Sequence, residues 1–211
     1  MTLTFYDCST APSPRRARMV LAEKRVPHEV VEVDLRSGEQ FSGEYRAINP
    51  RCTVPALKLD DGTILTDNAS IARWLEEVYP DPPLMGTTPV EKAFVAEWLW
   101  RVEFEGLSAI MEVLRNTSKA MKDRALPGPD PTPQIPELAE RGRARATRFF
   151  EAMDARLAET PWLGGDTFSV ADIAGFVFVE FAGWVKLQPG EGQTNLATWR
   201  EAIRARPSGQ V

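Results

Sequence analysis

The stretch CTVPALKLDDGTILTDNASI, residues 52–71, decides the fold of this chain. Residues 56–59 and 63–65 are two short apolar runs, and the Asp-Gly pair between them supplies the turn chemistry of a β-hairpin. A helix is expected next, over residues 67–79. Its apolar face is predicted to consist of Ile71, Trp74, Leu75 and Val78.

The residues before this stretch predict a βαβ unit. Residues 3–8 have the pattern of a strand, and residues 14–23 have that of a helix with proline in its first turn. Residues 28–34 are rich in β-branched side chains and follow Pro27, which indicates a second strand parallel to the first. The order βαβ and then ββα is complete by Tyr79.

Three prolines at positions 80, 82 and 83 interrupt the helical pattern after Tyr79. A domain boundary is expected there. The prediction is a first α/β domain at residues 1–79, a linker at residues 80–87 and a second, all-α domain at residues 88–211.

The second domain is predicted to be a helical bundle. Residues 95–113 carry one apolar stripe of a long helix, and residues 146–157 carry another. Residues 173–185 are apolar on most sides, as expected of a helix in the middle of a bundle. Ser169 and Asp172 form the pattern of a capping box at its start, which is a folding signal.

Composition excludes several classes of partner. Lys+Arg 25 against Asp+Glu 30 gives a net charge of -5, so neither nucleic acid nor a membrane surface is an expected partner. No apolar run reaches the ~18 residues of a membrane span, and a cytoplasmic protein is expected. Two cysteines and one histidine give no zinc spacing, so no metal is predicted. Four arginines are interpreted as a solvent-exposed helix face and not as a nucleic-acid site, because no aromatic side chains are interleaved with them: Arg141, Arg143, Arg145 and Arg148.

Two neighbouring features predict a peptide-binding site. A cis bond at Val54–Pro55 would turn the Val54 backbone outward, where it can pair with an extended peptide. Asp67 and Asn68 lie at a helix N-terminus, whose free N–H groups favour a carboxylate while Asp67 accepts from an amine. A proline at an ordinary strand start and an N-cap aspartate would give the same residues.

In this order, the motifs resemble those of the cytosolic glutathione transferases over essentially the whole chain. The segments that carry the resemblance are residues 12–24, 37–40, 49–50, 53–57, 67–71 and 169–173. The resemblance implies a thioredoxin-like, glutathione-binding first domain and a helical second domain that supplies most of the site for an apolar electrophile. It also implies a homodimer, a role in detoxification, and glutathione as co-substrate without a further cofactor.

The resemblance also implies roles for individual residues. Val54 would pair its backbone with the cysteinyl part of glutathione, and Asp67 and Asn68 would hold the γ-glutamyl end. Gln40 matches a His or Gln near the glycyl carboxylate, and Thr53 stands where the family often has Gln. Asn68 stands where the family usually has Ser.

The group that activates the thiol departs from the family pattern. The usual Ser, Tyr or Cys is replaced by Ala11, whose methyl group cannot activate a thiol. Ser13 is the nearest hydroxyl. The Pro-x-Pro-x-Arg arrangement most resembles a bacterial and fungal branch in which a water on the long helix of the second domain replaces the side chain. Ser108 matches the serine that holds this water, whereas the histidine that accompanies it there is absent. Ser13 and Ser108 are the candidate catalytic residues.

The predicted function is transfer of glutathione sulfur to an electrophilic, fairly apolar carbon. A non-catalytic scaffold or regulatory protein of the same fold is the alternative that Ala11 and Asn68 favour. A glutathione-dependent reductase, peroxidase or lyase is a third hypothesis. Cys52 lies beside the predicted site and could form a mixed disulfide with glutathione.

Overall fold

The computed structural model describes residues 2–211, which divide into two compact units. The first unit runs through Pro82 and also takes in Pro127–Asp130 and Val211. The second unit consists of Pro83–Leu126 and Pro131–Gln210. No helix in residues 2–211 is long and apolar enough to cross a membrane.

The first unit is built on a mixed sheet with the strand order β2-β1-β3-β4. The central strand β1 (Thr4–Asp7) is parallel to β2 (Glu29–Glu32) and antiparallel to β3 (Ala56–Lys58). The short strand β4 (Ile64–Leu65) completes the hairpin with β3. Both the parallel pair and the hairpin were predicted, and this sheet confirms the thioredoxin-like architecture.

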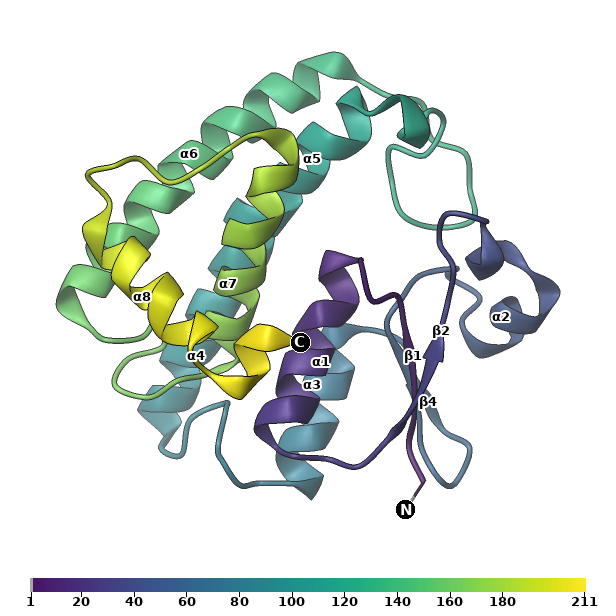
Figure 1. Ribbon diagram of the computed structural model, residues 1–211, viewed down its shortest axis with the longest axis horizontal. Helices are drawn as coiled ribbons and strands as arrows, with labels where there is room; N and C mark the ends of the chain where they lie inside the picture. The colour runs from purple at the N-terminus through teal and green to yellow at the C-terminus, as the bar shows by residue number, and fades with distance from the viewer. Residues whose placement is uncertain (1) are drawn as a thin grey trace. The chain divides into compact units, whose positions relative to one another are not determined.

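The helices of the first unit are α1 (Pro12–Glu23), α2 (Gly43–Ile48) and α3 (Asn68–Val78), with a single 3-10 turn η1 (Glu39–Phe41). Helices α1 and α3 lie side by side (Figure 1). Ile71 and Leu75 are buried on α3 as expected. Val78 is 39% exposed, because it is the last residue of the helix, so its predicted place on the apolar face was wrong.

The second unit is helical in every regular element, as predicted. Its main helices are α4 (Pro89–Arg101), α5 (Ser108–Thr117), α6 (Pro136–Glu159), α7 (Val170–Ala182) and α8 (Thr194–Arg204). The shorter segments are η2 (Val102–Leu107), η3 (Lys119–Met121), η4 (Gly183–Val185) and η5 (Pro207–Gln210).

The long helix predicted over residues 95–113 is present with one irregularity. Its path runs from α4 to α5 through η2, a π-helical segment. A π-segment widens the helix by one residue per turn, and such segments are often found at functional sites. The predicted apolar stripe is still buried on this path at Val95, Val102 and Val113.

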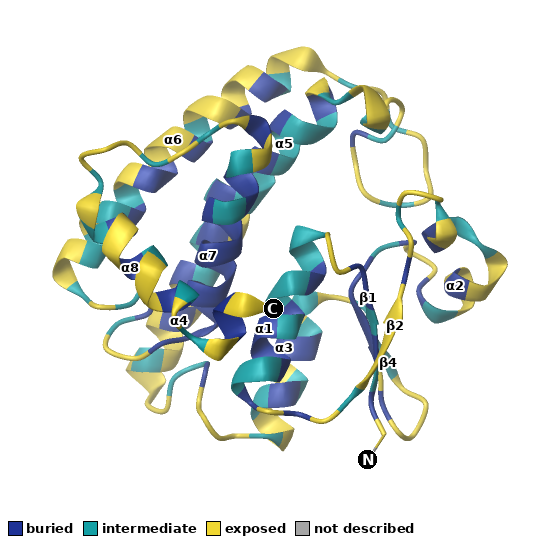
Figure 2. Cartoon of the chain, viewed as in Figure 1, coloured by how far each residue is buried: buried dark blue, intermediate teal, exposed yellow. Residues whose placement is uncertain are grey.

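Helix α7 forms the core of the second unit. It is buried along nearly its whole length (Figure 2). The ring of Phe178 on this helix contacts those of Phe149 and Phe150 on α6, with centroids 5.4 and 4.9 Å apart. The capping box of Ser169 and Asp172 is present, as predicted. Trp184 is 57% exposed, because it lies beyond the end of α7 in η4.

Candidate functional site

Tyr45 and Asn49 fix the loop that enters β3. The Tyr45 hydroxyl donates to the carbonyl oxygen of Thr53 at 2.7 Å. Asn49 Nδ2 donates to the same carbonyl at 2.7 Å and to Thr53 Oγ1 at 3.1 Å. Burial raises the pKa of Tyr45, so its hydroxyl remains a donor at neutral pH. With both Thr53 oxygens engaged, the loop holds Val54 in one orientation.

Val54 is the first predicted site residue on this loop. The Val54–Pro55 peptide bond is cis, as predicted. Neither the N–H nor the C=O of Val54 has a hydrogen-bond partner among residues 2–211. The Val54 side chain is buried in an apolar cluster with Cys8, and Ala11 packs against the same cluster. An unpaired N–H and C=O on the same residue can pair with the backbone of a bound peptide.

Ser13 lies in the first turn of α1. Ala11 is the N-cap, and its own N–H donates to the Cys8 carbonyl at 2.8 Å. Pro12 and Pro14 have no N–H, so Ser13 carries the one backbone donor of the first three helical positions. This N–H has no partner in the described part of the chain. Ser13, the predicted catalytic residue in this turn, therefore offers both a hydroxyl group and the one free backbone N–H at the start of α1.

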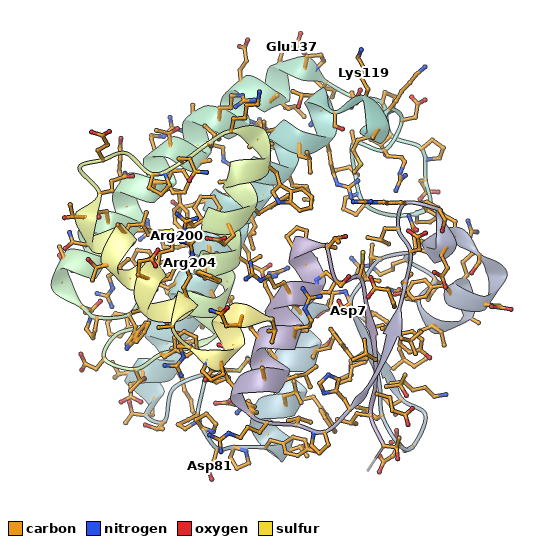
Figure 3. The ribbon with its side chains drawn as sticks, viewed as in Figure 1. Asp7, Asp81, Lys119, Glu137, Arg200 and Arg204 are labelled. Carbon is orange, nitrogen blue, oxygen red and sulfur yellow. The ribbon has the colours of Figure 1, made fainter. Side chains whose placement is uncertain are left out.

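An ion pair braces the turn between β1 and α1. Arg18 Nη1 donates to both carboxylate oxygens of Asp7, at 2.7 and 2.8 Å, and Nη2 donates to the Ser9 carbonyl at 3.0 Å. Asp7 is buried at the end of β1 (Figure 3). This pair fixes the segment that carries Ala11. This ion pair was not predicted, although a carboxylate at a strand end and an arginine in the next helix are a signal that the sequence contains.

Asp67 and Asn68 open α3. Asp67 is the N-cap, and its Oδ1 accepts from Ser70 N at 2.7 Å. The N–H groups of Asn68 and Ala69 have no partner among residues 2–211. Asn68 Nδ2 donates to Ser13 Oγ at 3.1 Å, and its Oδ1 is buried without a partner. The two helix starts are thus joined by a side-chain hydrogen bond that the sequence did not predict.

Gln40 lies in η1, apart from these contacts. Gln40 is 3% exposed, and its Oε1 is a buried acceptor without a partner in residues 2–211. An unpaired buried amide oxygen costs about 1–3 kcal/mol relative to a bonded one. A ligand that donates to this oxygen would remove that cost. No described contact connects Gln40 to Val54 or Asp67.

Ser108 belongs to the second unit, at the junction of η2 and α5. Its hydroxyl donates to the Phe104 carbonyl and accepts from Arg145 Nη2 at 3.2 Å. Arg145 also donates to the Phe104 carbonyl, pairs with Glu112 at 3.0 Å and lies 5.1 Å from the centroid of the Phe104 ring. Ser108 therefore already takes part in a hydrogen-bond network that links the π-helical segment η2 to α6.

The arginine face predicted on α6 is only partly solvent-exposed. Arg141 has 59% of its side chain exposed, but Arg145 has 19% exposed because Glu112 and Phe104 hold it. Arg143 donates to the Val185 carbonyl at 3.0 Å. The sequence pattern missed these partners because they come from α5, η2 and η4, which are distant in the chain.

Contacts within the first unit bring four predicted site residues together. The apolar cluster joins Val54 to Ala11 at the start of α1, and the hydrogen bond from Asn68 joins Ser13 in the same turn to Asp67 at the start of α3. These contacts link the Val54 loop to the start of α1, and the start of α1 to the start of α3. Within residues 2–211, no group of three or more His, Cys, Asp or Glu residues is arranged to hold a metal ion.

Comparison with known proteins gives matches over nearly the whole chain. Residues 10–78 match the family profile described as glutathione S-transferase, N-terminal domain, and residues 108–207 match glutathione S-transferase, C-terminal domain. Glutathione S-transferase 2 of Saccharomyces cerevisiae is 33% identical over 211 residues, covering 98% of this chain and 87% of that protein.

Solved structures agree with these matches. A glutathione S-transferase domain-containing protein from Marinobacter aquaeolei superposes with a TM-score of 0.89 at 32% identity, covering 97% of this chain and 98% of that chain. Gtt2 from Saccharomyces cerevisiae superposes with a TM-score of 0.89 at 32% identity, covering 98% of each chain. The chain therefore belongs to the glutathione S-transferase family.

Proposed function

We propose that this protein is a glutathione transferase that binds glutathione on its first unit and promotes attack of the thiolate on an electrophilic, fairly apolar carbon. The observations that carry this proposal are the unpaired N–H and C=O of Val54 and the unpaired N–H groups of Asn68 and Ala69, which follow the Asp67 carboxylate at the start of α3. The name of one relative, Glutathione S-transferase 2 of Saccharomyces cerevisiae, supports it.

Each unpaired group has a counterpart in glutathione. The N–H and C=O of Val54 would pair with the cysteinyl backbone as an added strand. The free N–H groups of Asn68 and Ala69 at the start of α3 would bind the γ-glutamyl carboxylate, and Asp67 would accept from its ammonium group. An α-amino-acid end thus meets donors and an acceptor on three consecutive residues.

Gln40 and Thr53 have different parts in this proposal. Gln40 would bind the glycyl end, where its buried Oε1 would accept from the glycyl N–H. Both oxygens of Thr53 are already engaged by Tyr45 and Asn49. Thr53 would therefore act by orienting Val54 and not by touching the ligand through its side chain.

The chemical step needs the glutathione thiol as its thiolate. The thiol proton passes to solvent, and the Ser13 O–H and N–H donate hydrogen bonds to the sulfur without transferring a proton. The thiolate then forms the new C–S bond, and the leaving group departs with its bonding electrons. Ser108 is the second candidate, and it would act by holding a water that donates to the sulfur.

Asp67→Asn tests the binding proposal with a matched control. Asparagine caps a helix as well as aspartate does, so α3 stays capped while the negative charge that would bind the ammonium is lost. We expect the Kd for glutathione to rise about 10-fold to 100-fold, since a hydrogen bond to a charged group contributes about 1.5–3 kcal/mol.

Asp61→Asn makes the same change on an exposed aspartate of the same unit, whose Oδ1 also accepts a backbone N–H, that of Thr63 at 2.8 Å. This control is expected to leave the Kd unchanged in isothermal titration calorimetry. Wild-type protein that fails to bind glutathione, or equal Kd values for the two variants, would contradict the proposed site.

Ser13→Ala and Ser108→Ala separate the two candidate catalytic residues. We expect Ser13→Ala to lower kcat/KM for glutathione and an activated aryl halide about 10-fold to 1,000-fold, as loss of a donor to a developing charge does in other enzymes. Ser108→Ala should have a smaller effect, because the Ser108 proton is already donated to the Phe104 carbonyl. Steady-state kinetics of both variants would refute the role of Ser13 if Ser108→Ala alone reduced turnover.

Family membership also supports a homodimer, an acceptor site on the second unit and a role in detoxification, and we propose all three. We propose that the π-helical segment η2 lines the site for the electrophilic substrate, because its Phe104 is 56% exposed. An exposed ring of this kind suits an apolar electrophile.

A further inference from the structure

The hydrogen bond between Ser13 and Asn68 determines where the Ser13 proton can go. A serine hydroxyl has one proton to donate and two lone pairs that accept. Asn68 Nδ2 donates to Ser13 Oγ at 3.1 Å and so occupies one lone pair. No acceptor for the Ser13 proton is present in residues 2–211. The Ser13 hydroxyl therefore accepts a hydrogen bond from Asn68, and its own proton remains available for donation to a ligand.

The Asn68 amide is itself held in a defined way. Its Oδ1 is buried and without a partner among residues 2–211, so the hydrogen bond from Nδ2 to Ser13 is what holds the amide in place. Asn68 is the first residue of α3, and the N-cap hydrogen bond between Asp67 and Ser70 fixes its backbone. A short side chain on a fixed helix start has little freedom to withdraw from Ser13.

We propose that Asn68 is a positioning residue for thiol activation, because its amide holds the Ser13 oxygen and directs the Ser13 O–H to the glutathione sulfur. This inference rests on the proposed function. In the proposed function, the backbone N–H of Asn68 binds the γ-glutamyl carboxylate. The present inference gives the Asn68 side chain a second role. Asn68 does not touch the reacting atoms, and it acts through Ser13.

A carboxylate at position 68 would reverse the direction of the hydrogen bond. Asn68→Asp cannot donate to Ser13 and would accept its proton instead, so that the hydroxyl is turned away from the sulfur. Asn68→Ala would remove the restraint and leave the hydroxyl free to rotate. An acidic residue in the first turn of a helix favours the helix, so Asn68→Asp is expected to fold if Asn68→Ala does not.

The test is the pKa of the thiol of bound glutathione, read from the ultraviolet absorption of the thiolate in wild-type protein, Ser13→Ala, Asn68→Ala and the double variant. A hydrogen bond to the thiolate lowers this pKa by on the order of one unit, so Ser13→Ala should raise it by about that much. Asn68→Ala should raise it by part of that amount. The double variant should be no higher than Ser13→Ala alone, because Asn68 acts only through Ser13.

Asn68→Asp should raise the thiol pKa at least as far as Asn68→Ala. Asn195→Ala is the matched control, since it removes the same side chain at a position where Nδ2 binds Asp154 in the second unit, and it should leave the thiol pKa unchanged.

Two other outcomes would overturn the inference in different ways. If Asn68→Ala weakens glutathione binding but leaves the thiol pKa unchanged, or shifts it equally with and without Ser13, Asn68 is a plain ligand contact and only the positioning role fails. If glutathione does not bind to the wild-type protein, or binds with the thiol pKa of free glutathione, the proposed function fails and the inference with it.

Discussion

Replacing Asp172 by Ala is expected to lower the free energy of unfolding at neutral pH by about 3–5 kcal/mol, a large part of the stability of a typical domain. The carboxylate is completely buried and accepts four hydrogen bonds. They come from Leu163 N at 2.8 Å, Trp199 Nε1 at 2.9 Å, Ser169 N at 3.0 Å and Ser169 Oγ at 2.9 Å. Alanine would leave buried donors without an acceptor, and each such group costs about 1–3 kcal/mol.

Urea unfolding of Asp172→Ala and of Asp166→Ala measures this effect. Asp166 is exposed on the loop before the same helix, so its replacement should change the free energy of unfolding by less than about 0.5 kcal/mol. Ser169→Ala should lie between the two variants, because it removes the side-chain cap but keeps the carboxylate. Equal unfolding midpoints for the two aspartate variants would contradict the structural role of Asp172.

Asp172 also predicts a specific pH dependence. Burial raises its pKa from 3.8 to about 6, despite the hydrogen bonds that favour the carboxylate. The folded protein therefore binds this proton more tightly than the unfolded chain does. The part of the stability that is linked to this proton is full below pH ~4 and is lost as the pH rises through ~6, by on the order of 3 kcal/mol, while the four hydrogen bonds to the carboxylate remain. Asp172→Asn has no such proton, so its stability relative to wild type should increase from pH 4 to pH 7.

Lys24→Met is the second substitution with a large expected effect. The Lys24 side chain is fully buried in the first unit, and its Nζ lies 2.7 Å from Glu76 Oε2. Nζ also donates to the carbonyls of Tyr79 at 2.7 Å and Pro82 at 2.9 Å. All three protons of the ammonium are used. Lys24 thus fastens α1 to the end of α3 and to the segment where the first unit ends.

Methionine has a similar length but no donor, so it would leave two carbonyls without their partner and the Glu76 carboxylate without its positive charge. Breaking a buried ion pair from one side costs about 3–5 kcal/mol. We expect a loss of this size in urea unfolding and faster proteolysis between residues 79 and 83. Lys58→Met, on an exposed position of β3, is the control and should change neither. Unchanged proteolysis in Lys24→Met would show that the segment is held by other contacts.

Local patterns predicted most of the fold. The Asp-Gly turn, the β-branched run before it and the capping box of Ser169 each specify an element through bonds between residues close in sequence. Helix α2 and the turn η1 were not predicted, because six and three residues are too short for an apolar period to appear. The π-segment η2 was hidden for a different reason, since its apolar stripe has the spacing of an ordinary helix.

The site was predictable only in part. Val54–Pro55 and Asp67 could be identified because a proline before a strand and an aspartate before a helix have direct backbone consequences. The bond from Asn68 to Ser13 spans 55 residues, and nothing in a single sequence shows which side chains two helix starts bring within 3.1 Å. The arginine partner of Ser108 likewise depends on the packing of α6 against η2.

We propose that the first unit binds glutathione and stabilises its thiolate. The most direct test is a titration of wild-type protein with glutathione at several pH values, following both the heat of binding and the ultraviolet absorption of the thiolate. We predict saturable binding with a thiol pKa about one unit or more below that of free glutathione. Binding with an unshifted thiol pKa would contradict thiolate stabilisation, and no binding at all would contradict the site itself.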